Sequence, residues 1–161
     1  MSGIVNNTGA VSGVIGRTVG GAGRVIQLVE GSLVTSGAHN STSWAEHTSA
    51  TRTTIIPSSI NSKIFIGGVI TCYVQGGGNW TAFRRDIGGT VTMPLYDNNG
   101  YGSYLGGALP IANHGSWNIW AIDSPNTTSA VIYSLASKSS SSPYNSFTHK
   151  ATKIYLMEIA G

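Results

Sequence analysis

Three apolar runs near the end of the chain decide its fold: Trp117–Ile122 (WNIWAI), Ala130–Ala136 (AVIYSLA) and Lys153–Ile159 (KIYLMEI). Each run is rich in β-branched and aromatic residues and is too short for an ordinary helix. Turn-forming and Ser-rich segments separate the three runs. This pattern is typical of an antiparallel meander, so we predict that the end of the chain is sheet.

Alternation along these runs assigns their side chains to faces, because successive residues of a strand point to opposite sides. In the middle run one face carries Val131, Tyr133 and Leu135. In the last run the two faces carry Tyr155, Met157 and Ile159, and Ile154, Leu156 and Glu158. Both faces are apolar enough to be covered. We expect the face of Tyr155 to form a subunit contact; a strand covered on both sides within one domain is the alternative.

Earlier parts of the chain show further strand patterns. We predict strands at Arg24–Glu30, Thr48–Ile56, Lys63–Val74, Trp80–Asp86 and Thr90–Tyr96.

Two short features refine this prediction. Asp97–Gly100 (DNNG) favours a hairpin turn, because Asn-Gly accommodates positive φ angles. Gly67-Gly68, inside the longest run, predicts a bulge or a close backbone approach. Tyr101–Ile111 fits no single pattern.

Eight to ten short strands without a helix pattern predict an all-β fold, an antiparallel, jelly-roll-like β-sandwich, with a closed β-barrel as the alternative. The 161 residues suffice for one domain with a core of its own. We assign residues 24–161 to this sandwich and residues 1–23 to an extended N-terminal arm.

The arm is rich in glycine, which makes its backbone costly to order. It nevertheless carries apolar pairs, whereas a solvating tail would carry charge. We predict that the arm orders along a neighbouring molecule and that Ile4, Val5, Val14 and Ile15 fill shallow pockets there. A terminus without a role is the alternative.

Charged residues make up only 9% of the chain, against roughly 25% in typical domains. Charge keeps free monomers apart, so this composition favours a component of an assembly. The net charge of +3 is spread thinly, and Arg84-Arg85 is the one adjacent basic pair. We therefore expect no nucleic-acid partner, because phosphate binding needs a dense basic footprint.

Residues that could carry chemistry are scattered. The four histidines lack the short spacings of a zinc site, and the six acids are isolated in the sequence. No Gly-x-Ser-x-Gly motif or phosphate-binding motif occurs. We expect no metal, no cofactor and no enzymatic activity, with a polysaccharide hydrolase as an alternative.

The sequence also bears on where the protein is made. Cys72 lies in an apolar run, which predicts a buried thiol. The N-terminus lacks the pattern of a signal peptide, and no apolar run reaches membrane-spanning length. We expect a soluble protein made in a cytoplasm, without membrane insertion.

Aromatic residues beside Asn- and Gly-rich loops suggest a second role. Trp80, Tyr96, Tyr101 and Tyr104 have the chemistry of a sugar-stacking rim. We keep glycan binding by this rim as a hypothesis, with packing of the rings in the core as the alternative.

Four segments carry a resemblance to a known group: Ser2–Gly16 (SGIVNNTGAVSGVIG), Thr53–Ile64 (TTIIPSSINSKI), Asp123–Tyr133 (DSPNTTSAVIY) and Met157–Ile159 (MEI). Together they resemble small virion structural proteins of tailed bacteriophages, especially marine phages. The resemblance covers most of the chain except Gly76–Ile111.

This resemblance implies a capsid decoration (cement) or head-fibre protein, commonly a homotrimer, made in the host bacterial cytoplasm and located in the virion. Its N-terminal segment would attach to the major capsid protein or another virion protein, and a β-sandwich would project. A tail-fibre or receptor-binding module that recognises a host surface glycan is the alternative.

Overall fold

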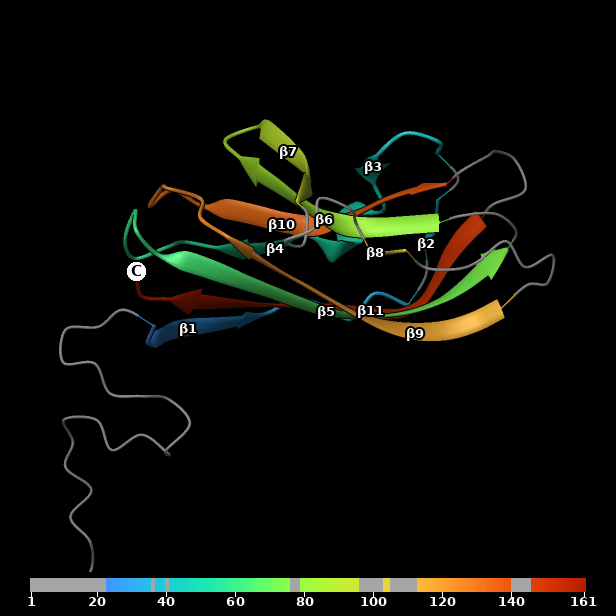
Figure 1. The fold of residues 1–161 in the computed structure, drawn as a ribbon, viewed down its shortest axis with the longest axis horizontal. Helices are drawn as coiled ribbons and strands as arrows, with labels where there is room; N and C mark the ends of the chain where they lie inside the picture. Colours follow the sequence, from blue (N-terminus) through green and yellow to red (C-terminus); the bar gives the residue numbers. More distant parts are fainter. Residues whose placement is uncertain are drawn as a thin grey trace, which may run out of the picture.

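A computed structural model describes the backbone of residues 23–35, 37–39, 41–75, 79–95, 103–104, 113–139 and 146–161. These residues form two antiparallel β-sheets that lie one on the other (Figure 1). The prediction of an all-β sandwich is confirmed. The two sheets are separate in this part of the chain, so the sandwich forms there and the closed barrel does not.

One layer is the β5 sheet, named after its longest central strand. Its strand order is β1-β11-β5-β9, and β2 pairs with the first part of β11. The bounds are β1 Val25–Glu30, β2 Gly37–His39, β5 Lys63–Gln75, β9 Asn113–Asp123 and β11 Ser146–Ile159. The long apolar pattern that predicted a central core strand is therefore correct for β5, which pairs along its length with both β11 and β9.

The other layer is the β10 sheet, in which β10 pairs with β6 on one side and with the short β3 and β4 on the other. β7 and β8 pair with the free side of β6. The bounds are β3 Ala45–Glu46, β4 Thr53–Ile55, β6 Asn79–Ile87, β7 Thr90–Leu95, β8 Ser103–Tyr104 and β10 Val131–Ser139.

The core lies between the two sheets and follows the predicted alternation. Its fully buried members from the central strands are Ile64, Ile66, Ile70, Val131, Tyr133, Leu135, Ile154 and Leu156. Phe83 from β6 packs in the same cluster. Burying such side chains is the main stabilising contribution, at about 25 cal/mol per Å² of apolar surface removed from water.

One predicted strand is shorter than expected. Thr48–Ile56 alternates well, yet Ser49–Thr51 forms a 3-10 turn, and only Thr53–Ile55 pairs in the sheet. The Thr48 hydroxyl accepts a hydrogen bond from the Ala50 N–H, so the side chain caps the turn. Thr and Ser side chains favour such turns over strand pairing, because their hydroxyl groups form hydrogen bonds with nearby backbone groups.

The two central glycines of β5 form no bulge, because pairing with β11 and β9 passes through them without a register shift. The predicted close approach is present instead. A Cβ on Gly67 would lie 3.0 Å from the Phe65 ring, and one on Gly68 would lie 3.3 Å from the Lys153 carbonyl. Glycine therefore lets neighbouring groups lie directly on the strand.

A partly buried polar contact joins the two sheets near the end of β9. The Asp123 carboxylate accepts a hydrogen bond from the Tyr133 hydroxyl at 2.7 Å and pairs with Arg85 at 2.8 Å. Burial and then the Asp123 carboxylate raise the pKa of Tyr133 far above its usual value. The Tyr133 phenol therefore stays protonated, and the Asp123 carboxylate is paired with groups of the same molecule.

Several predictions fall outside the described residues. They concern most of the arm with Ile4, Val5, Val14 and Ile15, the Asp97–Gly100 turn, most of Tyr101–Ile111, and the side chain of Cys72. Gly23, the last residue of the predicted arm, donates its N–H to the Ala160 carbonyl at 2.7 Å.

Candidate interaction surfaces

The outer face of the β5 sheet, which points away from the core, is apolar across four strands. Strand register aligns Leu28 with Met157, Met157 with Phe65, and Phe65 with Ile122. These four side chains form one continuous row, which we call the apolar row. Leu28 is 62% exposed and Ile122 is 54% exposed, which is unusual for large aliphatic side chains on the same surface.

A second line of contacts on this face extends the apolar row. Phe65 stacks on Trp120, with ring centroids 6.4 Å apart and an interplanar angle of 14°. Trp120 itself is 51% exposed. Tyr155 lies beside Gly67, which in turn lies beside Trp120. The Phe65 ring covers Gly67, so the aromatic surface continues across β5.

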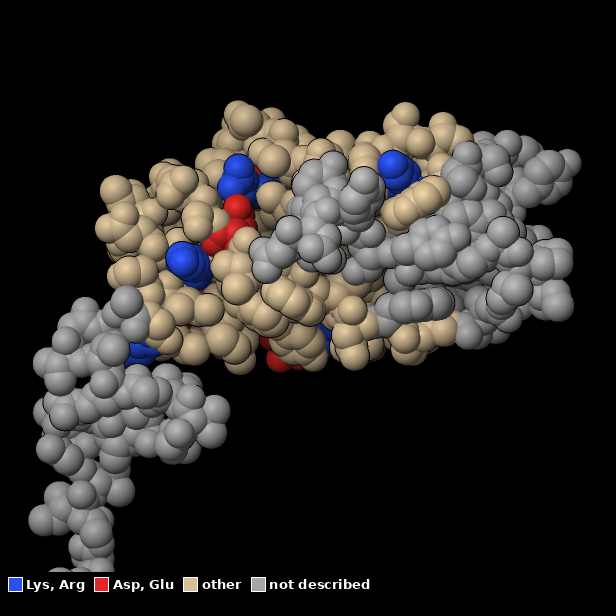
Figure 2. Space-filling model, viewed as in Figure 1, with Lys and Arg blue, Asp and Glu red and all other residues tan. Residues whose placement is uncertain are grey.

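Charged side chains on this face include Lys63, at the start of β5, and an ion pair between β11 and β1. Lys153 forms an ion pair with Glu30, and its ammonium lies 5.8 Å from the centre of the Tyr155 ring. The two charges cancel. On the side of the molecule seen in Figure 2, where the two sheets are viewed edge-on, charged atoms of the described residues lie in small groups among uncharged ones.

The structure places the predicted subunit-contact residues Tyr155, Met157 and Ile159 on the outer side of β11. They are half-buried or exposed, whereas Ile154 and Leu156 are buried in the core. Subunit contact by the outer residues stays a prediction, because the structure holds a single chain.

Glu158 also points inward, and it is fully buried. Its Oε1 accepts hydrogen bonds from the Ser58 N–H and from the hydroxyls of Ser58 and Ser62, at 2.6 to 2.7 Å. Its Oε2 accepts one from Gln27 Nε2 at 2.6 Å. Burial alone would raise the pKa of Glu158, but these hydrogen bonds together lower it. The carboxylate is therefore an ionised anchor between β11, β1 and the β4–β5 connection.

The outer face of the β10 sheet carries a cluster of aromatic and basic residues. The Lys138 ammonium lies 5.2 Å from the centre of the Trp44 ring and 5.1 Å from that of Trp80. Both distances allow a cation–π interaction. We call these three residues the tryptophan clamp.

The predicted aromatic rim is brought together only in part. Trp80 belongs to the tryptophan clamp, and the backbone of Tyr104 pairs with it through β8. Tyr96 and Tyr101 lie outside the described residues. Sequence reasoning missed Trp44, since it lies in a polar stretch with no strand pattern and reaches the clamp only because β3 pairs with β10.

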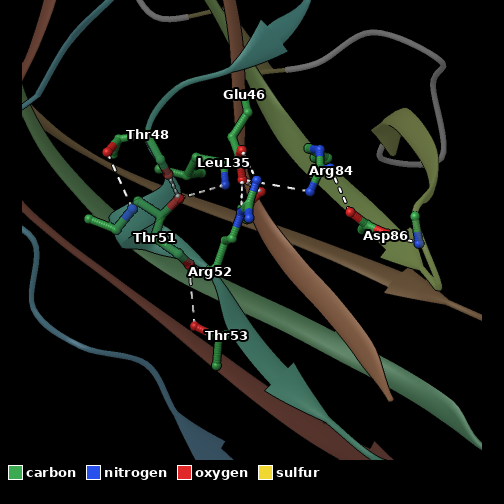
Figure 3. A network of polar contacts seen from close by, with 11 residues as sticks. Glu46, Thr48, Thr51, Arg52, Thr53, Arg84, Asp86 and Leu135 are labelled. Carbon is green, nitrogen blue, oxygen red and sulfur yellow. Dashed lines mark hydrogen bonds and ion pairs between the residues drawn. The ribbon is translucent and has the colours of Figure 1, made fainter. Parts of the chain in front are cut away.

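An ion network occupies the same outer face, farther along β6 (Figure 3). Arg52 donates two hydrogen bonds to the Glu46 carboxylate, at 2.8 and 2.7 Å. Arg84 lies between Glu46 and Asp86, 3.6 Å from a Glu46 oxygen and 2.8 Å from an Asp86 oxygen. The acids that are isolated in the sequence are therefore joined in space by arginines.

The hydrogen bonds from Arg52 lower the pKa of Glu46 against an opposing effect of burial, and Ser134 assists. Arg84 lowers the pKa of Asp86 in the same way, helped by the Gly89 N–H. Both carboxylates are thus held ionised. Arg84 is buried, and its Nη1 donates no hydrogen bond to any residue that the structure describes.

The described part of the chain offers no metal-binding cluster and no membrane-spanning helix. It contains no group of three or more His, Cys, Asp and Glu residues arranged to hold a metal ion. No helix there combines the length and apolar character needed to cross a bilayer. No model of a known protein family matches the chain, and no curated protein is significantly similar to it.

Proposed function

We propose that the protein is a structural component of a bacteriophage virion, either a capsid decoration protein or a head-fibre protein. Residues 1–23 attach it to the major capsid protein or another virion protein, and the β-sandwich projects. The sequence resemblance suggests the particle, and the physical properties of the chain support assembly into one. The role is non-enzymatic.

The observation that carries this proposal is the apolar outer face of the β5 sheet. Monomeric soluble proteins rarely expose large contiguous apolar patches, and such patches commonly mark contacts with other molecules. Here the apolar row crosses four strands beside the exposed rings of Trp120 and Tyr155. Few charged side chains interrupt this apolar surface, in a chain with only 9% charged residues.

Mass spectrometry of purified particles tests the proposal. We expect the protein to copurify with virions, in numbers comparable to the major capsid protein for a decoration role. A variant with Ile4, Val5, Val14 and Ile15 replaced by Ser should fold, as judged by circular dichroism, yet be missing from particles. Absence of the wild-type chain from particles, or full incorporation of the variant, would refute it.

A second candidate function is recognition of a host surface glycan by a tail fibre, and the tryptophan clamp favours it. Indole rings offer flat apolar surfaces that bind sugar rings, while Lys138 supplies a hydrogen-bond donor. The ion network adds further polar groups on the same face.

Adsorption of phage to host cells distinguishes this second function. Trp44→Ala and Trp80→Ala should each reduce adsorption while leaving particle composition unchanged. Ile60→Ala is the control, because Ile60 is exposed in the β4–β5 connection and belongs neither to the tryptophan clamp nor to the apolar row. Unchanged adsorption in both clamp variants would exclude glycan binding at this cluster. Release of reducing sugar by wild type, lost in Glu46→Gln, would instead show a hydrolase.

A further inference from the structure

Most open edges of the two sheets carry features that discourage pairing with another chain. β1 has a register shift between Val25 and Gln27, and β7 contains Pro94 and pairs irregularly with β6. β2, β3, β4 and β8 are only two or three residues long. Bulges, proline and short length are the usual protections of sheet edges, because an unpaired edge recruits further strands.

β9 has none of these protections. It is 11 residues long and pairs with β5 from Asn113 to Asp123 without a register shift. Within the described ranges, no strand pairs with its other side, and Figure 1 shows it at the margin of the β5 sheet. It contains no Lys, Arg, Glu or Pro, and its one acid, Asp123, is paired internally with Arg85.

Such an edge presents a row of backbone N–H and C=O groups that lack partners in the sheet. Its outer face adds large apolar side chains, with Trp120 51% and Ile122 54% exposed. A strand that pairs here therefore gains both backbone hydrogen bonds and apolar burial.

We propose that β9 is the edge through which two copies of this chain join, with the two β9 strands antiparallel across a two-fold axis. A strand pairs antiparallel with its own copy in a self-complementary way, as a two-fold interface requires. β9 contains no Lys, Arg or Glu, and Asp123 is paired with Arg85, so none of these charges opposes its own copy. The two β5 sheets become one, and both apolar rows lie on the same side of it.

Asn118 is the middle residue of β9, and its exposed side chain lies on the outer face beside Val69. Self-pairing of β9 places Asn118 near the two-fold axis, close to Asn118 of the second copy. Charges introduced there oppose each other directly in a homodimer. A substitution at Asn118 therefore tests pairing at the β9 edge without changing the core.

The purified full-length chain is sufficient for the test, since self-pairing requires no virion. We expect sedimentation and light scattering to show a dimer for wild type. Asn118→Lys and Asn118→Glu should each weaken the dimer at least about tenfold, because opposed like charges cost several kcal/mol. A mixture of the two variants should dimerise again. Leu28→Lys, on the same face at the opposite edge, is the matched control and should remain dimeric.

Hydrogen exchange provides a second measurement at the backbone. Amides of β9 should gain protection as protein concentration rises, while those of β7 should not. A wild-type chain that stays monomeric would overturn the proposal. So would a dimer or trimer that resists both Asn118 charges but dissociates in Leu28→Lys, since the apolar row would then form the contact instead.

Discussion

Replacing Glu158 by Gln should destabilise the fold much more than an ordinary surface substitution. The carboxylate is fully buried and accepts four hydrogen bonds, three at Oε1 and one at Oε2. Gln has nearly the same shape but only one acceptor oxygen. The change therefore isolates the chemistry of the carboxylate from its volume.

The cost follows from the geometry. If the new amide oxygen faces Ser58 and Ser62, the new NH2 faces Gln27 Nε2, and two donors meet. Rotating the Gln27 amide would sacrifice its 2.7 Å hydrogen bond to the Ile56 carbonyl. One hydrogen bond is lost, and the remaining three are no longer charge-assisted, because their acceptor is neutral. We expect a loss of about 2 to 3 kcal/mol in the free energy of unfolding.

Urea denaturation at pH 7, followed by tryptophan fluorescence, measures this loss. Glu30→Gln is the matched control, because Glu30 pairs with Lys153 at the surface with its side chain 55% exposed. The control should cost less than about 1 kcal/mol. Equal effects of the two substitutions would refute the assignment of Glu158 as a buried anchor.

The pH dependence gives the same argument a second test. The pKa of Glu158 is lowered in the folded state, so the unfolded chain binds this proton more tightly. The ionised Glu158 carboxylate makes its full contribution to the free energy of unfolding well above its pKa in the unfolded chain, about 4.3. This contribution is lost as the pH falls through the lower pKa of the folded state. Wild type should therefore lose more stability than Glu158→Gln below about pH 4. Parallel pH profiles would contradict this.

Two further substitutions test the packing. Leu135→Ala removes a fully buried core side chain and should lower the free energy of unfolding by about 2 to 5 kcal/mol, measured by thermal unfolding. Ile60→Ala is the control and should change it little, because Ile60 is 57% exposed. Gly31→Ala would place its Cβ in direct overlap with Thr53 Oγ1, so it should cost about 1 to 3 kcal/mol. An unchanged melting temperature would show that the Thr53 side chain moves aside freely.

Local sequence patterns predicted the strands and their inward faces well. The alternation of Tyr133 and Leu135 correctly assigned them to the core, and the apolar length of β5 correctly marked a central strand. These features depend on neighbouring residues, since the strand period of two is a property of the backbone. The same pattern failed at Thr48–Ile56, where hydroxyl groups bond to nearby backbone and form a turn.

The contacts between distant segments were decided by tertiary structure. Lys138 lies over the rings of both Trp44 and Trp80, and Arg84 links Glu46 to Asp86, because β10 pairs with both β3 and β6.

By itself, then, the sequence determined an all-β chain with few charges, its core-facing residues, and apolar groups left over on the last strand. Only the tertiary structure decided that these groups align across four strands into one surface and that β9 lies at an open edge. The physical reason is that strand order and register depend on the pairing of segments far apart in the chain, and local periodicity carries no information about that pairing.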